Sequence, residues 1–82
     1  MDSRLNLIIG EIDLILGDTG VPKNIKKALL DSKERLLSED EWNVKISSAI
    51  YYINNISEDI NMPTHSRMQI WTIISELESL KE

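Results

Sequence analysis

The chain has 82 residues, enough for one domain with a modest hydrophobic core. Its 14 acidic and 9 basic residues give a net charge of −5, which argues against nucleic acid as the main partner, because such binding neutralises phosphates with Lys and Arg. The absence of cysteine excludes disulfides, thiolate catalysis and zinc–thiolate sites.

The N-terminal segment is a poor signal peptide, because Asp2, Asn6 and Glu11 interrupt its apolar residues. No apolar run in the sequence approaches the roughly 20 residues that cross a bilayer. We therefore expect a cytoplasmic protein.

The first predicted helix begins near Ser3, whose hydroxyl can accept a free N–H of the first turn. Gly17 and Gly20 let the backbone leave that helix. Gly10 lies inside it and costs roughly 1 kcal/mol relative to Ala, so we interpret it as a point of close helix approach, with tolerated drift as the alternative. The apolar stripe of this helix has the spacing i, i+3, i+4, i+7 and consists of Leu5, Ile8, Ile9, Ile12, Ile15 and Leu16.

The second helix is predicted to start at Pro22, because proline suits the first helical position, where its missing N–H costs nothing. Ser32 falls on the apolar face of this helix at the helical spacing. The rest of that face consists of Ile25, Ala28, Leu29 and Leu36.

The segment "SEDE" at 38–41 has the spacing of a capping box and predicts the start of the third helix. Residues 57–62 are predicted as a loop, and Pro63 restarts a fourth helix. The third stripe consists of Trp42, Ile46, Ala49, Ile50, Ile53 and Ile56, and the fourth of Ile70, Ile73, Ile74, Leu77 and Leu80.

The two halves of the chain match at a spacing of 41 residues. This register predicts two copies of one helical hairpin, at about 3–37 and 42–80, although any two amphipathic hairpins would match at apolar positions. Neither hairpin can bury its apolar face alone, and the connections are short. We therefore expect a single domain, 1–82, that is all-α and forms an up-down antiparallel four-helix bundle from two duplicated helical hairpins.

The turns "GDTGVPKN" and "EDINMPTH" each place an Asp four residues before a Pro. Our hypothesis is that Asp18 and Asp59 are structural caps, whose side chains accept backbone N–H groups near Pro22 and Pro63 and cap the following helix. The alternative is that both are solvated loop acids.

In an up-down bundle the first and third loops lie at the same end, so the repeated turns bring two helix N-termini together. Helix N-termini with basic residues nearby can bind anions, such as phosphate or an acidic protein. The candidate anion site consists of Lys23, Lys26, Lys27, His65 and Arg67. A solvated charged surface is the alternative, and we favour it.

The sequence holds little that supports catalysis. It has one His and no Cys, and Asp59 and Arg67 are the only nearby candidates in sequence to assist His65. There is no Glu-x-x-His motif for a metal in the bundle core and no Gly-rich phosphate loop. We predict that the protein is not an enzyme and uses no metal or cofactor; a helix-turn-helix DNA reader is also disfavoured, because Asp31 and Glu34 interrupt the basic residues of the second helix.

Several large apolar residues flank the main stripes or lie outside them. Bundle helices touch two neighbours, so wide apolar faces are partly expected. Trp, Tyr and Met are also enriched at protein interfaces, which makes a protein-interaction or structural module, with a partner or with itself, the leading function and anion binding the alternative. The candidate interface consists of Leu7, Leu14, Leu30, Leu37, Tyr51, Tyr52, Met68 and Trp71.

The segments "DTGVPKNIKKAL", "EDINMPTHSR" and "IWTIISELE" resemble uncharacterised protein family 0147, a family of small acidic archaeal proteins, over nearly the whole chain. The first turn of that family commonly reads Asp-Thr-Thr-Val-Pro-Arg-Asn, and here Gly20 replaces the second Thr and Lys23 the Arg. Retaining a base at position 23 suits an anion site, whereas Gly20 supplies no hydroxyl to it. The resemblance implies an all-helical bundle and carries no assigned activity.

Overall fold

The computed structural model describes residues 2–82 and contains four α-helices, with no strand among those residues. The prediction of an all-α fold with four helices is therefore confirmed. The helices are α1 (Ser3–Leu16), α2 (Lys23–Leu36), α3 (Trp42–Asn54) and α4 (Thr64–Ser79).

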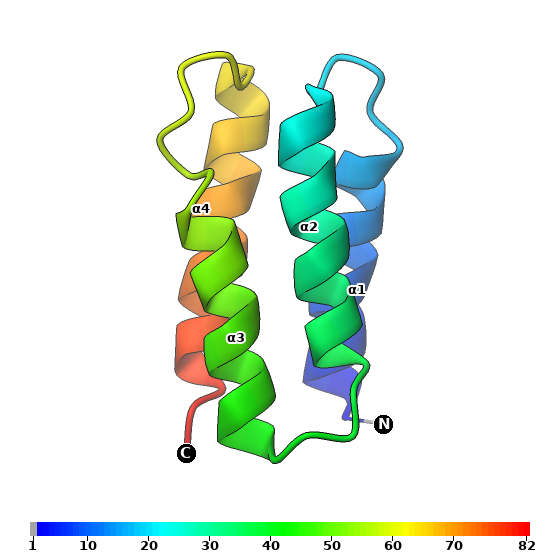
Figure 1. Ribbon diagram of the computed structural model, residues 1–82, viewed down its shortest axis with the longest axis vertical. Coiled ribbons are helices and arrows are strands. Elements are labelled where there is room, and N and C mark those ends of the chain that lie inside the picture. The colour runs from blue at the N-terminus through cyan, green and yellow to red at the C-terminus, as the bar shows by residue number, and fades with distance from the viewer. Residues whose placement is uncertain (1) are drawn as a thin grey trace.

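The four helices lie side by side in a bundle of 33 × 20 × 17 Å (Figure 1). The α1–α2 and α3–α4 loops lie at the upper end of this view, and the α2–α3 connection lies at the lower end with the two chain ends. α2 packs against α1 and α3, while α4 packs against α3 and α1. The repeated turns, 41 residues apart in sequence, therefore share one end of the molecule.

The helix starts differ in detail from the sequence predictions. Asp2 caps α1 by accepting the Arg4 N–H at 2.8 Å, so the cap lies one residue before the predicted Ser3. Pro22 and Pro63 were predicted at the first helical position but occupy the N-cap positions of α2 and α4, so both helices begin one residue later than predicted.

The predicted capping box at 38–41 is wrong. Glu41 is the N-cap of α3, and its side chain accepts the Asn43 N–H at 3.3 Å. The Ser38 hydroxyl instead donates to the Arg35 carbonyl at 2.7 Å. The Ser38 hydroxyl therefore satisfies a carbonyl at the C-terminus of α2, because carbonyls there lack partners within the helix.

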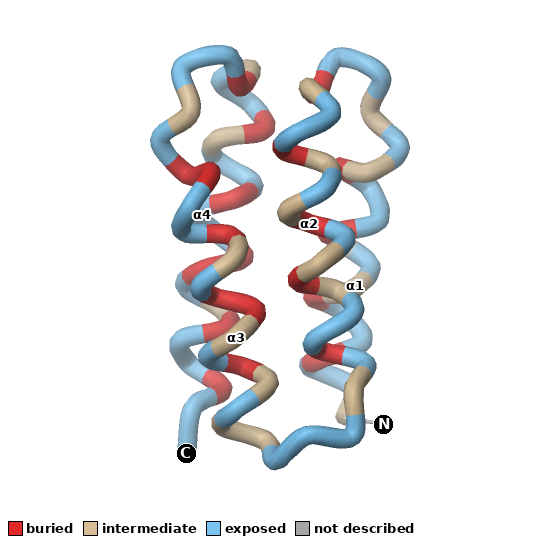
Figure 2. Tube along the Cα trace, in the orientation of Figure 1, coloured by how far each residue is buried: buried red, intermediate tan, exposed pale blue. Residues whose placement is uncertain are grey.

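Buried residues recur along the inner side of every helix (Figure 2). Val21 and Met62 add buried side chains from the two repeated turns. The burial follows the 41-residue register, since both members are buried in the pairs Leu5 and Ile46, Ile8 and Ala49, Ile12 and Ile53, Ile15 and Ile56, Val21 and Met62, Ile25 and Ser66, Leu29 and Ile70, Ser32 and Ile73, and Leu36 and Leu77.

Two buried serines differ in their hydrogen bonding. The Ser32 hydroxyl donates to the Ala49 carbonyl at 3.2 Å and so links α2 to α3. The Ser66 hydroxyl on α4 is buried and has no hydrogen-bond partner within residues 2–82. An unpaired buried hydroxyl destabilises the folded state, because it has lost its bonds to water.

The interpretation of Gly10 as a point of close helix approach is wrong. A Cβ added at Gly10 meets nothing within 4 Å, and the residue is exposed. The space beside α1 at this position would therefore accept a side chain.

Candidate functional site

The two loop aspartates form the same hydrogen bond in their respective turns. Asp18 Oδ1 accepts the Gly20 N–H at 2.8 Å, and Asp59 Oδ1 accepts the Asn61 N–H at 2.8 Å. Both N–H groups lie in the loop ahead of the proline, and no side chain caps the first turn of α2 or α4. Each aspartate thus closes its own loop.

Each aspartate also reaches the other hairpin. Asp18 Oδ2 lies 3.0 Å from His65 Nε2 in the first turn of α4. Asp59 Oδ2 accepts the Asn24 side-chain amide at 2.9 Å in the first turn of α2. Asn24 and His65 are 41 residues apart, as Asp18 and Asp59 are, so the two contacts occupy equivalent positions in the 41-residue register.

These contacts stabilise the charged forms of both aspartates. The His65 side chain, then the Gly20 N–H, hold the pKa of Asp18 below its ordinary value of 3.8. The Asn61 N–H, then the Asn24 amide, lower the pKa of Asp59. Two negative charges therefore lie among the predicted basic cluster at neutral pH.

Three of the five residues of the candidate anion site have partners in the chain itself. Lys27 forms an ion pair with Asp31 at 2.8 Å. An Arg67 guanidinium nitrogen donates to the Asp59 carbonyl at 3.0 Å, and His65 contacts Asp18 as above. Lys23 and Lys26 form no ion pair or side-chain hydrogen bond within residues 2–82. The five predicted residues thus lie at the loop end of the bundle. Two of them, Lys23 and Lys26, are unpaired within residues 2–82.

Seven of the eight candidate interface residues are exposed, and Tyr52 is half-buried. The exposed fractions reach 72% at Leu14, 68% at Met68 and 64% at Tyr51. Val44 and Ile60 are also exposed, although the sequence analysis did not single them out. The exposed apolar residues are distributed over all four helices, so the structure does not gather the predicted set into one patch.

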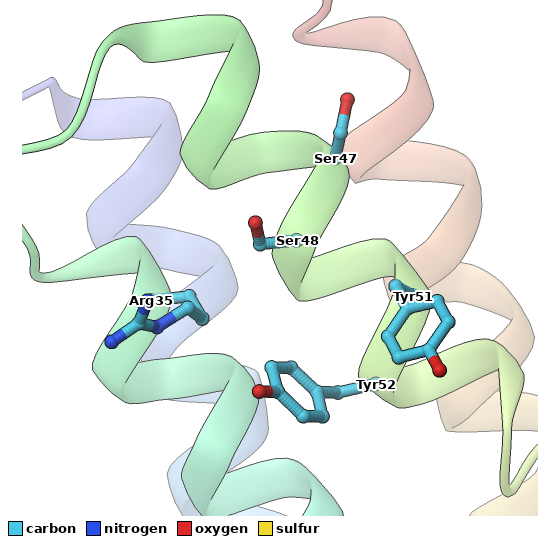
Figure 3. A pocket seen from close by; sticks show the side chains of 5 residues that line it. All are labelled: Arg35, Ser47, Ser48, Tyr51 and Tyr52. Atoms are coloured by element: carbon cyan, nitrogen blue, oxygen red, sulfur yellow. The ribbon is translucent and has the colours of Figure 1, made fainter.

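A hollow of about 310 Å³ opens on the surface of α2 and α3 (Figure 3). It is lined by Arg35 from α2 and by Ser47, Ser48, Tyr51 and Tyr52 from α3. The two Tyr rings pack edge to face, with centroids 5.7 Å apart and an interplanar angle of 73°. Of these lining residues only the tyrosines were predicted from the sequence, because the convergence of Arg35, Ser47 and Ser48 depends on how α2 and α3 are rotated relative to one another.

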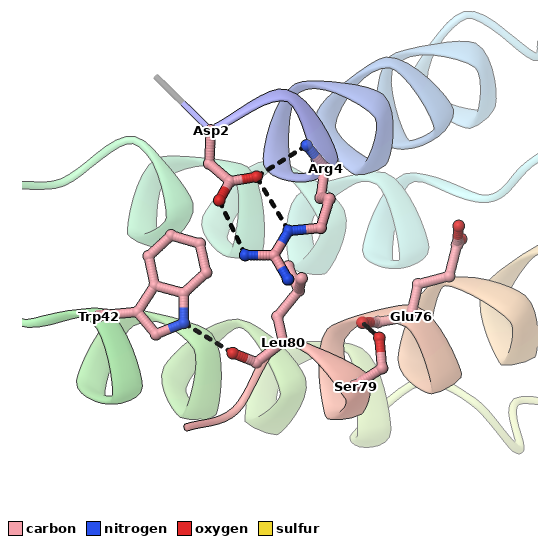
Figure 4. Close-up of polar contacts among 6 residues, drawn as sticks. All are labelled: Asp2, Arg4, Trp42, Glu76, Ser79 and Leu80. Atoms are coloured by element: carbon pink, nitrogen blue, oxygen red, sulfur yellow. Dashed lines mark hydrogen bonds and ion pairs between the residues drawn. The ribbon is translucent and has the colours of Figure 1, made fainter.

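A smaller hollow of about 150 Å³ lies between α1 and α4 near the lower end of the bundle and is bordered by Arg4, Leu7 and Glu76. The Arg4 guanidinium forms an ion pair with Asp2 at 2.9 Å, and nearby the Trp42 indole N–H donates to the Leu80 carbonyl at 2.7 Å (Figure 4). The Trp42–Leu80 bond ties the C-terminal end of the described chain to α3, whereas the Asp2–Arg4 pair is local to the start of α1.

Glu11 on α1 lies near Glu76 on α4, across the same helix pair. Partial burial, then the side chain of Glu76, raise the pKa of Glu11 from 4.5 to about 7. One carboxyl oxygen of Glu76 is buried without a hydrogen-bond partner within residues 2–82. No sequence signal would have paired these residues, since they lie on different helices.

Within residues 2–82 no group of three or more His, Cys, Asp or Glu side chains is arranged to hold a metal ion. In the same part of the chain, no helix is both long and apolar enough to span a membrane. The His65–Asp18 contact is exposed to solvent.

Residues 1–80 match the model of the uncharacterised protein family UPF0147. The chain belongs to this family. A UPF0147 protein from Methanocaldococcus jannaschii is 48% identical over 71 residues, covering 85% of this chain and 76% of that relative. One from Saccharolobus islandicus is 42% identical over 82 residues, covering 99% and 92%.

Two crystal structures of similar proteins share the fold. The unknown function protein MMP1188 superposes with a TM-score of 0.90 and 45% identity, over 96% of this chain and 91% of that one. A UPF0147 protein from Thermoplasma acidophilum gives a TM-score of 0.88 with 32% identity, over 96% and 94%. The resemblance found in the sequence is confirmed, and UPF0147 has no assigned function.

Proposed function

We propose that this UPF0147 chain is a non-catalytic protein-interaction module. The observation that carries the proposal is the exposed apolar surface. Among residues 2–82, nine large hydrophobic residues are exposed. The core is already filled by other residues, so the fold has no need of these side chains in their exposed positions.

The types of residue support a protein partner. Trp71, Tyr51 and Met68 belong to the classes enriched in interface cores. Covering exposed apolar side chains with a partner lowers the free energy by about 25 cal/mol per Å² of apolar surface removed from water.

The architecture that we propose for this module is an up-down bundle of two duplicated hairpins. The buried pairs in the 41-residue register support it, because they include positions in all four helices and both turns. The equivalent contacts of Asp18 with His65 and of Asp59 with Asn24 support it further, since polar contacts do not follow from amphipathic patterning.

Anion binding at the loop end remains the alternative, supported by the unpaired Lys23 and Lys26. The geometry gives it less support, because the charges of Asp18 and Asp59 oppose an incoming anion. Titration with phosphate followed by NMR tests it. Shifts at the amides of Lys23 and Lys26 would support the site, and unchanged shifts there and at Arg67 would remove it.

The interaction proposal is tested with one Glu substitution on each helix: Leu7→Glu, Leu30→Glu, Tyr51→Glu and Trp71→Glu. Immobilised wild type and variants are exposed to extract of the source organism, and retained proteins are quantified by mass spectrometry. We expect at least one variant to lose a retained protein by about tenfold, equivalent to 1.4 kcal/mol, with an unchanged melting curve. Identical retention by all five proteins, or none by wild type, would contradict the proposal.

A further inference from the structure

α3 differs from the other helices in its charge. α1 carries Glu11 and Asp13, and α2 and α4 also carry two acidic residues each. α3 carries none, and its one charged side chain is Lys45. In a chain with 14 acidic residues, this leaves one helix whose outer face is free of negative charge.

The outer face of α3 is rich in hydroxyl and apolar groups. Val44, Ser47 and Tyr51 are exposed, and Ser48 and Tyr52 are half-buried beside the hollow of Figure 3. The four hydroxyls form no hydrogen bond within residues 2–82. Tyr and Ser together give a contact surface of large rigid rings and adaptable hydrogen bonds, a composition also found in antibody binding loops.

We propose that the outer face of α3 binds a second copy of this chain, with the two α3 helices antiparallel across a twofold axis. This inference rests on the proposed function and names the partner and the surface. Each copy carries a net charge of −5, so two copies repel when acidic faces meet. The α3 face is where two copies approach without opposing carboxylates on the contacting helices.

The register of the contact follows from the remaining charges. Lys45, Ser48 and Tyr52 share one stripe of α3, at spacings of three and four residues. The Lys45 ammonium lies 5.6 Å from the centre of the Trp42 ring. Glu58 is exposed in the turn beyond the other end of α3. Neither charge has an ion-pair partner within residues 2–82.

A twofold interface is reciprocal, so each contact occurs twice. With the axis at Tyr51 and Tyr52, midway between positions 45 and 58, Lys45 of each copy lies opposite Glu58 of the second copy. The tyrosines then meet their counterparts at the centre, where interface hot spots concentrate.

Sedimentation equilibrium tests this arrangement, on wild type, Lys45→Glu, the double variant Lys45→Glu with Glu58→Lys, and the control Asn6→Glu at an exposed position of α1. We expect the dimer Kd to rise about tenfold in Lys45→Glu, an effect of 1.4 kcal/mol, because the change sets two carboxylates opposite each other. The double variant restores the pairing with reversed sign, and its Kd returns to within about threefold of wild type. The control keeps the wild-type value.

A wild type that stays monomeric at millimolar concentration, an unchanged Lys45→Glu, or a double variant as weak as the single one would each overturn the inference. Failure of the inference is distinguishable from failure of the proposed function. A monomeric wild type that still loses an extract protein on substitution at Leu7 or Trp71 refutes only the dimer. A monomer that retains nothing from extract refutes both.

Discussion

Asp18 and His65 join the two hairpins at the loop end of the bundle, with Asp18 Oδ2 lying 3.0 Å from His65 Nε2. In the equivalent contact, Asp59 of the second hairpin reaches back to the first hairpin, where its Oδ2 lies 2.9 Å from Asn24 Nδ2. Each aspartate also accepts an N–H of its own loop. One carboxylate in each turn therefore shapes its loop and links that loop to the other hairpin.

Substituting either loop aspartate is expected to weaken the fold. Asp18→Ala and Asp59→Ala each remove a bond within the loop and a bond between hairpins, so both should lower the midpoint of urea unfolding with an unchanged m value. The difference from wild type should shrink as the pH falls below about 4, where the carboxyls of the unfolded chain become protonated. Glu34→Ala, which removes a carboxylate without a partner within residues 2–82, is the control. Two midpoints equal to that control would show that both acids are merely solvated.

The free energy of unfolding should peak at mildly acidic pH. Because the pKa of Glu11 is raised from 4.5 to about 7, the folded state keeps a proton that the unfolded state loses across this range. The contribution of Glu11 is therefore full below about pH 4.5 and is lost as the pH rises through 7. Asp18 and Asp59, with lowered pKa values, act oppositely: their contribution is present above about pH 4 and is lost as the pH falls below that value.

Glu11→Gln tests the basic side of this curve. At pH 8 the variant should be about 1 kcal/mol more stable than wild type, since partial exposure and solvent screening reduce the full electrostatic difference. Urea unfolding between pH 3 and 9, followed by Trp fluorescence, measures the curve. The slope from pH 5 to 8 should flatten in Glu11→Gln and persist in the control Glu34→Gln. An equal slope in both variants would refute the raised pKa of Glu11.

Two of the three buried serines, Ser32 and Ser66, should respond oppositely to loss of the hydroxyl. Ser66→Ala removes a buried hydroxyl without a partner and should stabilise the fold by about 1 kcal/mol. Ser32→Ala removes the bond to the Ala49 carbonyl and should destabilise it by about 1 kcal/mol. Because the substitution is the same, each variant serves as the control for the other. Thermal unfolding by circular dichroism measures both, and shifts of the same sign would contradict the hydrogen-bond assignment.

Gly10→Ala should stabilise α1. The added Cβ meets nothing within 4 Å, so the gain in helix propensity, about 1 kcal/mol, has no steric cost against it. For a domain of this size the melting temperature should rise by about 4–8 °C. Gly20→Ala is a useful contrast, because its Cβ would lie 3.3 Å from the Asp18 carboxylate. A lower melting temperature in Gly10→Ala would mean that a close contact exists at this position.

Much of the fold was predictable from side-chain periodicity. Ile12 and Ile53 fall on helical stripes and are fully buried, and the same holds for Leu36 and Leu77. The caps were less predictable, because Asp2 and Ser3 are adjacent residues that can both accept a first-turn N–H. Periodicity fixes which face of a helix is apolar but says little about its first residue.

The candidate site was predictable only in part. The expected up-down topology placed the two turns at one end of the bundle. It did not show that the charges of Asp18 and Asp59 would oppose those of the lysines there. The Glu11–Glu76 contact depends on how α1 and α4 are rotated against each other, which one sequence does not encode in any local pattern. Exposure of Leu7 and Trp71 likewise depended on the final packing.

The central claim is that this UPF0147 protein acts through an exposed surface, and that the outer face of α3 is the surface that a second copy covers. A concentration series of ¹⁵N–¹H NMR spectra on the wild-type protein tests this most directly. Between about 10 μM and 1 mM we expect progressive shifts confined to residues 44–58 and Arg35, with their midpoint at the Kd found by sedimentation. Spectra that do not change with concentration, or changes centred on Leu7 and Leu14 of α1, would contradict it.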